Sequence, residues 1–291
     1  MRTWATQVLG ATGEFDVLPT VGSKELVALL PTLLDVDSVI YPRIAYPTYL
    51  VGAMIAKARP IEVDIDASQW PAADLAWVNS PSNPTGRIHS EDELRAVIDY
   101  ARRNNAIIAS DECYLNFPAG DIAPTSILKV AAGDNTNLLA VHSLSKRSNL
   151  AGYRAAFIVG DPKVIATIRE VRKHAGLMVP LPVQRAMTVA LADETHAQAQ
   201  AEKYRARRSV LRAALEAAGF AVEFTDAGLY IWCTRQEEDW TSVAWLAELG
   251  ILATPGHFYG PAGSKHIRVA LTASDHDIAQ AAERITKAIS A

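Results

Sequence analysis

The 291-residue sequence has little cysteine and no long hydrophobic run, and both shortages exclude whole classes of protein. Its two cysteines, Cys113 and Cys233, lie far apart. They cannot form a disulfide framework or a four-ligand zinc site, and they are typical of a reducing compartment. The best apolar runs, such as 106–109 and 157–159, are far shorter than the roughly 20 residues that cross a bilayer. Because the N-terminus has no signal-peptide pattern either, we expect a cytoplasmic protein that does not insert into a membrane.

An excess of positive charge and the common cofactor and metal motifs are also missing. Lys plus Arg is 28 and Asp plus Glu is 32, which gives a net charge of −4. Nucleic-acid-binding domains usually carry a basic face or stripe, so no nucleic acid partner is expected. The sequence contains no G-x-G-x-x-G, G-x-x-x-x-G-K-[ST], H-E-x-x-H or G-x-S-x-G, and its 7 histidines are scattered. These absences argue against a dinucleotide enzyme and a metal site.

What the sequence does contain is an alternation of short apolar runs with amphipathic stretches. A helix is predicted from about Tyr49 to Lys57. Another begins at Ser90, which forms a capping-box pattern with Glu93 and is followed by an apolar stripe. Such alternation predicts βαβ units, and therefore a mostly parallel sheet covered by helices. The predicted strands of this sheet are 38–41, 75–78, 106–109, 138–141 and 155–159.

The composition of the sequence and the pattern of its predicted elements change at about Val183. A long Ala-rich, charged stretch runs to Ala218, and Gly219 is typical of a residue that ends a helix. Shorter strands follow at 221–224, 228–233, 251–253 and 266–271. We therefore expect a large α/β domain over residues 1–182, joined by a long helix to a smaller α+β domain over residues 183–291.

Polar clusters follow three of the predicted strands, at 79–86, 110–114 and 142–146. Ligands of open α/β sheets bind beyond the carboxyl ends of the strands, so these clusters predict one site. The last cluster ends in Lys146, and a lysine that binds pyridoxal phosphate needs three kinds of helper. A carboxylate must face the pyridine nitrogen, and donors must face the phosphate and the phenolic oxygen. The sequence offers Asp111 for the first, Ser143, Ser145 and Arg154 for the second, and Asn83 and Tyr114 for the third.

Taken in order, the segments Ser80-Pro81-Ser82-Asn83-Pro84-Thr85-Gly86, Ser110-Asp111-Glu112-Cys113-Tyr114 and 143–154 resemble the signatures of class I/II aminotransferases. These are pyridoxal 5′-phosphate enzymes of fold type I, and the resemblance extends from about Asp16 to the end of the chain. It implies that Lys146 binds the cofactor covalently and moves the substrate proton, with Asp111 and Tyr114 as further catalytic residues. It also implies that Asn83 and Tyr114 contact the phenolic oxygen, that Ser143 and Arg154 bind the phosphate, and that Arg268 and Asn83 bind the substrate.

Two segments upstream match the same family site. Gly22-Ser23-Lys24 begins an apolar-periodic stretch, and the free N–H groups of a helix N-terminus can hold a phosphate. A well-capped helix without a ligand would show the same pattern. In 45–49, Tyr46 matches the aromatic residue that stacks on the pyridine ring, although Tyr49 is an alternative and either could be a core residue. We expect His142 and Cys113 to be packed residues without a catalytic role.

Within the family, the segments 143–154, 172–180 and 258–263 are similar to those of succinyldiaminopimelate aminotransferases of the actinobacterial type. This resemblance implies amino transfer between L-glutamate and an N-succinylated 2-amino-6-ketopimelate-type keto acid, in lysine and diaminopimelate biosynthesis, by a homodimer. His257 departs from the pattern, because an acidic residue is expected there. The long dianionic substrate needs cations besides Arg268. Those available are Arg43, Arg147 and Lys173.

Three alternatives stay open at the level of the sequence. Another class I/II aminotransferase, or a carbon–sulfur lyase, would share the cofactor residues. A non-catalytic module that binds pyridoxal phosphate or a partner would keep them without turnover. The position of Gly22 bears on the last alternative, because family members usually carry several dozen residues before this motif. We therefore expect that an N-terminal segment is missing from the sequence.

Overall fold

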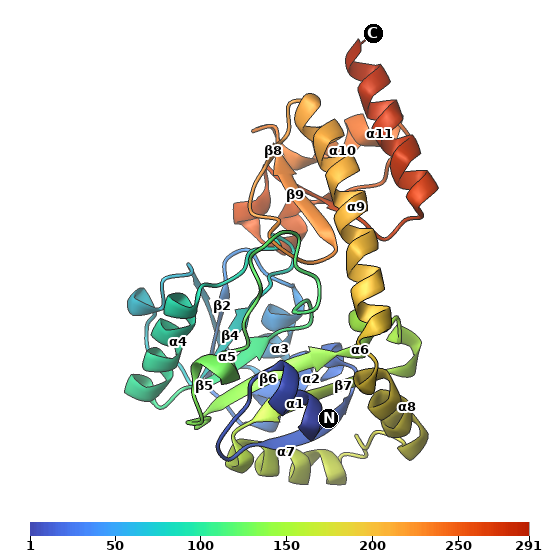
Figure 1. The fold of residues 1–291 in the computed structure, drawn as a ribbon. Coiled ribbons are helices and arrows are strands. Elements are labelled where there is room, and N and C mark those ends of the chain that lie inside the picture. The colour runs from blue at the N-terminus through green and yellow to red at the C-terminus, as the bar shows by residue number, and fades with distance from the viewer. Residues whose placement is uncertain (291) are drawn as a thin grey trace.

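In the computed structural model, which describes residues 1–290, the chain folds around two β-sheets in two lobes (Figure 1). Within these residues the larger sheet has seven strands, in the order β1-β7-β6-β5-β4-β2-β3. Strand β7 runs antiparallel to β6 and β1, and the other neighbouring strands pair in parallel. The predicted mostly parallel α/β sheet is therefore confirmed. Its strands are β1 (Asp16–Val21), β2 (Ser38–Pro42), β3 (Arg59–Val63), β4 (Leu75–Asn79), β5 (Ile107–Asp111), β6 (Leu138–Ser143) and β7 (Ala155–Gly160).

The central strands are apolar throughout because both faces of the sheet are covered. All residues of β4, β6 and β7 are buried, as is typical of strands with helices on both sides. Alternate residues of β4 belong to two different core clusters: Ala76 and Val78 to one, Leu75 and Trp77 to the other. The two clusters thus lie on opposite faces of the sheet.

Helices α1, α4, α5 and α8 contribute to the first cluster, and α2, α3 and α7 to the second. The capping box predicted at the start of α4 is present, because Ser90 and Glu93 exchange side-chain to backbone hydrogen bonds of 3.2 and 2.8 Å. No helix within residues 1–290 is long and apolar enough to cross a membrane. The helices of this lobe are α1 (Arg2–Val8), α2 (Ser23–Leu33), α3 (Thr48–Ala56), α4 (Glu91–Asn104), α5 (Ile127–Val130), α6 (Leu144–Arg147), α7 (Pro162–His174), α8 (Leu181–Ala192), and the 3₁₀ helices η1 (Ala67–Gln69) and η2 (Ala151–Tyr153).

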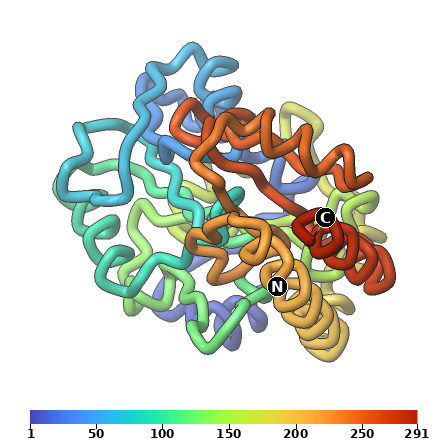
Figure 2. The backbone as a smooth tube through the Cα atoms, turned by 90° about the horizontal axis from the view of Figure 1, so that it is seen from above, coloured from blue at the N-terminus to red at the C-terminus, as the bar shows by residue number. Residues whose placement is uncertain are grey.

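The second lobe is built on an antiparallel sheet of order β10-β11-β9-β8. The long helix α9 (Thr195–Ala217) rises from the first lobe and lies beside α11 (Asp275–Ser290) in both views (Figures 1 and 2). A third core cluster, which includes Leu215, Ile231 and Ile285, fills this lobe. Its other elements are β8 (Ala221–Val222), β9 (Tyr230–Thr234), α10 (Asp239–Glu248), β10 (Thr254–Pro255), η3 (Gly256–Tyr259), η4 (Pro261–Gly263) and β11 (Ile267–Ala270).

The structure differs from the sequence-based elements in three places. Residues 251–253 are not a strand, and β10 begins after them. The Ala-rich stretch from 183 to 218 is divided between α8 and α9, because Asp193 adopts an extended backbone and accepts a hydrogen bond from the amide of Thr195. Strands β1 and β3 are not predicted, because Pro19 and Pro60 weaken the pattern of these edge strands. The domain boundary between residues 182 and 183 stays a prediction, and it falls within α8.

Candidate functional site

A cavity of about 640 Å³ lies where the carboxyl ends of β4, β5 and β6 face the second lobe. The three polar clusters that follow these strands meet there, as expected from the parallel arrangement. Its volume is within the range of roughly 300–1,000 Å³ that is usual for small-molecule sites. Eleven of the predicted site residues line it: Ser23, Lys24, Tyr46, Asn83, Asp111, Tyr114, Ser143, Ser145, Lys146, Arg154 and Arg268.

Asp111 is the last residue of β5 and lies at the floor of the cavity. Its Oδ1 accepts a hydrogen bond from the amide of Cys113 at 3.2 Å, and its Oδ2 accepts one from the Tyr49 hydroxyl at 3.0 Å. Burial raises the pKa of Asp111, while the hydrogen bonds from Cys113 and Tyr49 act in the opposite direction. Tyr49 is fully buried beneath Asp111, whereas Tyr46 is in the cavity wall. The structure thus separates the two tyrosines, and Tyr46 is the one placed where it could stack on a ring.

Arg268 reaches the cavity from β11 of the second lobe. Its Nη1 donates to Asn83 Oδ1 at 3.0 Å, and its guanidinium carbon lies 3.8 Å from the centre of the Tyr230 ring. Arginine can only donate, so the amide of Asn83 is oriented with its Nδ2 donors free for another acceptor. Asn79 holds the backbone on either side of this contact. Its Oδ1 accepts a hydrogen bond from the backbone N–H of Asn83 at 2.7 Å, and its Nδ2 donates to the backbone carbonyl of Asp111 at 2.9 Å.

Sequence reasoning assigned no role to Asn79 or Tyr230. Asn79 is the first residue of a polar cluster after a strand, and that position is the signal by which it could have been found. Tyr230 carries no such signal, because it belongs to the second lobe. Its hydroxyl lies 3.3 Å from the Tyr114 hydroxyl. Burial and this neighbouring hydroxyl raise the pKa of Tyr114 well above its ordinary value, so Tyr114 is a protonated donor at neutral pH.

The other end of the cavity is suited to a phosphate. Gly22 precedes α2 with a φ of +75°, and a Cβ placed on it would overlap Arg154 Nη2. Only glycine therefore lets the Arg154 guanidinium lie across the start of this helix. The amides at the N-terminus of α2, the Ser143 hydroxyl and the Arg154 guanidinium together form an anion-binding arrangement. These residues, with Lys146 and Asp111, fit pyridoxal phosphate.

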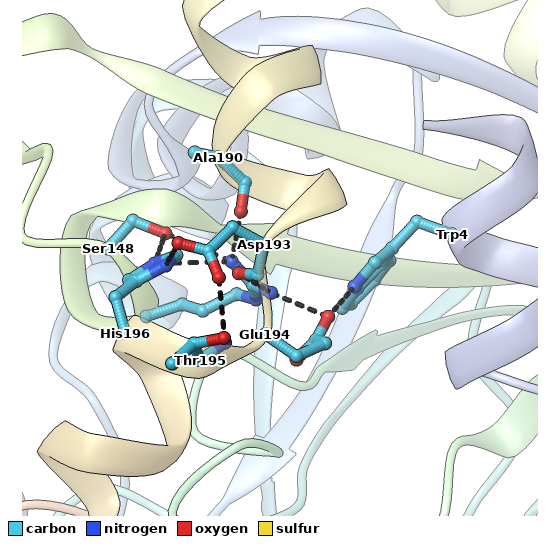
Figure 3. A network of polar contacts seen from close by, with 8 residues as sticks. Trp4, Ser148, Ala190, Asp193, Glu194, Thr195 and His196 are labelled. Atoms are coloured by element: carbon cyan, nitrogen blue, oxygen red, sulfur yellow. Dashed lines mark hydrogen bonds and ion pairs between the residues drawn. The ribbon is translucent and has the colours of Figure 1, made fainter.

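Arg147 follows Lys146 in α6, but its side chain is only 3% exposed and lies in the joint between α8 and α9. Its Nη2 pairs with Glu194 Oε1 at 2.6 Å, and its Nη1 donates to the carbonyl of Ala190 at 2.7 Å. Glu194 Oε1 also accepts from Trp4 Nε1 at 2.9 Å (Figure 3). The prediction that Arg147 is available to a distal carboxylate is therefore wrong, since its charge is already used within the fold.

The other two predicted distal cations do not line the cavity either. Arg43 is exposed and pairs with Asp64 at 3.3 Å, and Lys173 is exposed and pairs with Glu170 at 3.1 Å. His257 stands where an acidic residue was expected, and its Nδ1 lies 2.6 Å from Asp239 Oδ2. An acidic side chain is thus present at this place after all, but it comes from α10.

The two residues expected to be packed differ in their surroundings. His142 is buried, and its Nε2 lies 3.1 Å from Glu112 Oε2 while its ring stacks on Phe157. Cys113 is partly buried and lines the cavity, so it is less enclosed than His142. Burial and the nearby Asp111 carboxylate raise the pKa of its thiol well above the ordinary value. Within residues 1–290, no group of three or more His, Cys, Asp or Glu side chains is placed to hold a metal.

Comparison with known proteins agrees with this geometry. The family model "Aminotransferase class I and II" matches residues 6–285. The chain is 53% identical over 279 residues to a probable aminotransferase, Rv1178, of Mycobacterium tuberculosis, covering 94% of this chain and 66% of that protein. It is 49% identical over 291 residues to the 4-dedimethylamino-4-oxo-anhydrotetracycline transaminase OxyQ of Streptomyces rimosus, covering 97% of this chain and 80% of the relative.

A solved structure shares the fold. The probable N-succinyldiaminopimelate aminotransferase of Thermus thermophilus superposes with a TM-score of 0.89 at 25% sequence identity, covering 98% of this chain and 82% of that one. The chain therefore spans between about two thirds and four fifths of the proteins that it is similar to. Because the family match extends over nearly all of its residues, the chain belongs to the class I and II aminotransferases, a family whose members of this fold use pyridoxal 5′-phosphate.

Proposed function

We propose that the chain is a transaminase that moves an amino group between L-glutamate and an N-succinylated 2-amino-6-ketopimelate-type keto acid. Its place would be lysine and diaminopimelate biosynthesis, in the cytoplasm, as a homodimer. The observation that carries the proposal is the meeting of Lys146, Asp111 and Arg268 in one cavity. The segments similar to succinyldiaminopimelate aminotransferases, and the name of the Thermus thermophilus structure, support the choice of substrate.

At the cofactor end, each residue is assigned to one part of pyridoxal phosphate. When bound, this cofactor supplies an aldehyde that takes the amino group and a ring that withdraws electrons from the substrate α-carbon. Asp111 holds the proton on the ring nitrogen, and Tyr46 packs against the ring. The free Nδ2 of Asn83 and the hydroxyl of Tyr114 donate to the phenolic oxygen. The phosphate is held by the Gly22, Ser23 and Lys24 segment with Ser143 and Arg154.

At the substrate end, Arg268 binds the α-carboxylate with two parallel charge-assisted hydrogen bonds. The side chain of Asn83 fixes the Arg268 guanidinium by a hydrogen bond, and the Tyr230 ring packs against the face of the guanidinium. The Lys146 Nζ takes the α-proton from the amino donor and returns a proton on the cofactor side, and it acts in the reverse direction with the keto acid. General acid–base catalysis requires that the substrate is held close to the group that moves its proton. Arg268 and Lys146 meet this requirement because they line the same cavity.

The distal carboxylates of the acceptor need a cation that is not committed elsewhere. Arg43 and Lys173 are both exposed and outside the cavity, and Arg43 is the one whose backbone lies near the cavity wall, since its backbone oxygen lies against Gly260, next to Tyr259. Its guanidinium is exposed, and its pairing with Asp64 at 3.3 Å is a surface contact that a ligand carboxylate can replace. We assign the distal carboxylate to Arg43 for this reason.

A second candidate acceptor is a flat polycyclic ketone. The similarity to OxyQ, which is a 4-dedimethylamino-4-oxo-anhydrotetracycline transaminase, favours this substrate class. So does the aromatic part of the cavity wall, since aromatic side chains stack well on planar rings. The aromatic wall residues concerned are Tyr46, Tyr230, Phe258 and Tyr259.

The test begins with the absorption spectrum of the purified protein with pyridoxal phosphate, before and after addition of glutamate. We expect a spectral change with release of 2-oxoglutarate, followed by recovery on addition of the succinylated keto acid. Lys146→Ala should lower turnover at least about a hundredfold, the lower range for loss of a general base. Lys163→Ala is the matched control, because Lys163 is an exposed lysine on α7 outside the cavity.

Each contrary result points to a different alternative. Recovery only with a polycyclic ketone would move the assignment to the OxyQ type. Pyruvate and ammonia from cystathionine would favour a carbon–sulfur lyase. A spectrum that never changes with glutamate, or full turnover in Lys146→Ala, would show that the chain is not a transaminase of the proposed kind.

A further inference from the structure

A tyrosine outside the cavity, Tyr49, contacts the cavity residue Asp111. The hydroxyl lies 3.0 Å from Asp111 Oδ2, and both side chains are buried. The two residues come from different elements, since Tyr49 is on α3 and Asp111 ends β5. Tyr49 does not line the cavity, so it cannot touch a bound ligand directly. Any effect of its hydroxyl on the site must therefore pass through Asp111.

The position of Tyr49 is fixed from two sides. Its ring stacks on Trp77 with ring centres 4.9 Å apart, and the Tyr46 ring meets it edge-on at 5.7 Å. Within the described residues, Asp111 is the hydrogen-bond partner of its hydroxyl. Burial and then the Asp111 carboxylate raise the pKa of Tyr49 well above its ordinary value, so the hydroxyl stays protonated and donates.

We propose that Tyr49 is a positioning residue for Asp111, whose hydroxyl orients the carboxylate and favours its ionised form opposite the cofactor's ring nitrogen. This inference rests on the proposed assignment of Asp111 to that nitrogen. A buried carboxylate is costly unless donors satisfy it. The Cys113 amide supplies one donor to Oδ1, and Tyr49 supplies the donor to Oδ2.

Other titratable groups also face Asp111, and an experiment must separate them from Tyr49. The Cys113 thiol and the Tyr114 hydroxyl lie on the same loop, and the His142 imidazole comes from β6. His142 is itself paired with Glu112 at 3.1 Å. All of these groups stay in place when only the Tyr49 hydroxyl is removed, so a change seen in Tyr49→Phe belongs to that hydroxyl.

The experiment measures the dissociation constant of pyridoxal phosphate between about pH 5 and pH 9 by equilibrium dialysis. Loss of a donor to the carboxylate lets Asp111 take up a proton at higher pH, and a neutral carboxyl no longer balances a protonated ring nitrogen. We expect Tyr49→Phe to bind pyridoxal phosphate about tenfold more weakly, which is the effect of one hydrogen bond to a charged group. The acidic limb of the pH profile, where binding weakens as pH falls, should move up by about one pH unit.

Tyr100→Phe is the matched control. Tyr100 is also a buried tyrosine, and its hydroxyl donates to the Pro71 carbonyl at 2.8 Å, outside the cavity. It should bind the cofactor as the wild type does. A second measurement uses the analogue of pyridoxal phosphate in which carbon replaces the ring nitrogen. Since this analogue has no ring proton to balance, Tyr49→Phe and wild type should bind it equally well.

Two results would overturn the proposal: an acidic limb unchanged in Tyr49→Phe, or equal weakening toward the cofactor and the carbon analogue. Asp111→Asn tests the premise that the acidic limb belongs to Asp111. The acidic limb should then vanish, and a limb that persists would belong to another group and contradict the inference. Failure of the proposed function looks different, because then wild type and Tyr100→Phe would not bind pyridoxal phosphate either.

Discussion

His89 shows how strongly the fold can control the charge of one residue. Its side chain is buried, and burial followed by the nearby Arg87 charge lowers its pKa to about 4. An unfolded histidine takes up its proton near pH 6.5, so between about pH 6.5 and 4 the unfolded chain binds more protons than the folded one. We therefore expect the free energy of unfolding to fall across this window as pH decreases, by about 3 kcal/mol from His89 alone.

Urea unfolding of wild type and His89→Gln at about pH 7 and pH 4.5 measures this contribution. The variant should lose less stability on acidification than the wild type does. His174→Gln is the control, because His174 is an exposed histidine on α7 and should leave the pH dependence nearly unchanged. An equal slope in wild type and His89→Gln would show that His89 does not drive the acid sensitivity.

At this same scale, the residues that sequence could find are those that directly follow strands. Asp111, Asn83 and Lys146 each lie in a polar cluster after an apolar run, and all three line the cavity. Their neighbours are not predictable in this way, because orientation depends on tertiary contacts. Arg147 follows Lys146 yet is buried in the helix joint. Tyr49 lies under Asp111 only because α3 packs beneath the end of β5.

At the scale of elements, the start of α4 offers the sharpest test of local physics. Ser90→Ala removes the side-chain oxygen that accepts from the Glu93 amide, and loss of such a cap costs about 1 kcal/mol. The midpoint of urea unfolding should fall accordingly. Ser209→Ala is the control, because Ser209 is exposed within α9, where alanine is the better helix former. A loss of stability as large in Ser209→Ala would contradict the assignment to the cap.

The break between α8 and α9 marks the limit of prediction for elements. Alanine-rich sequence favours a continuous helix across this region. In the structure, Arg147 donates to the carbonyls of Ala190 and Asp193, which are the acceptors that a continuing helix would use. A side chain that precedes Ala190 by 43 residues thus binds the carbonyls left free at the break. The turn at Asp193 is local, but no pattern within 183–218 carries the contact with Arg147.

At the scale of the whole molecule, the class of the large sheet follows from alternation along the chain, but the site also needs the second lobe. Arg268, Tyr230 and Tyr259 come from the small antiparallel sheet and its loops, and they complete the cavity wall. Composition and periodicity say nothing about how this lobe meets the first. Only the resemblance to a family predicted a role for Arg268. It did not predict that Arg268 contacts Asn83 and Tyr230.

The predicted homodimer gives a test at this scale. Helix α3 exposes three apolar side chains, Val51, Met54 and Ile55, by 45%, 65% and 49%. Their spacing places them on one helix face, and clustered apolar exposure is typical of a contact surface. Because α3 directly follows the wall residues Tyr46 and Pro47, a second copy seated there would lie beside the cavity.

Sedimentation velocity over a range of concentrations should show a dimer for the wild type. Met54→Lys should weaken association at least about tenfold, since a buried, unpaired ammonium is costly. Leu252→Lys is the control: Leu252 is 91% exposed in the second lobe, away from α3 in the sequence, and its replacement should leave the dimer intact. A wild type that stays monomeric at all concentrations, or two variants that dissociate alike, would show that α3 is not the contact surface.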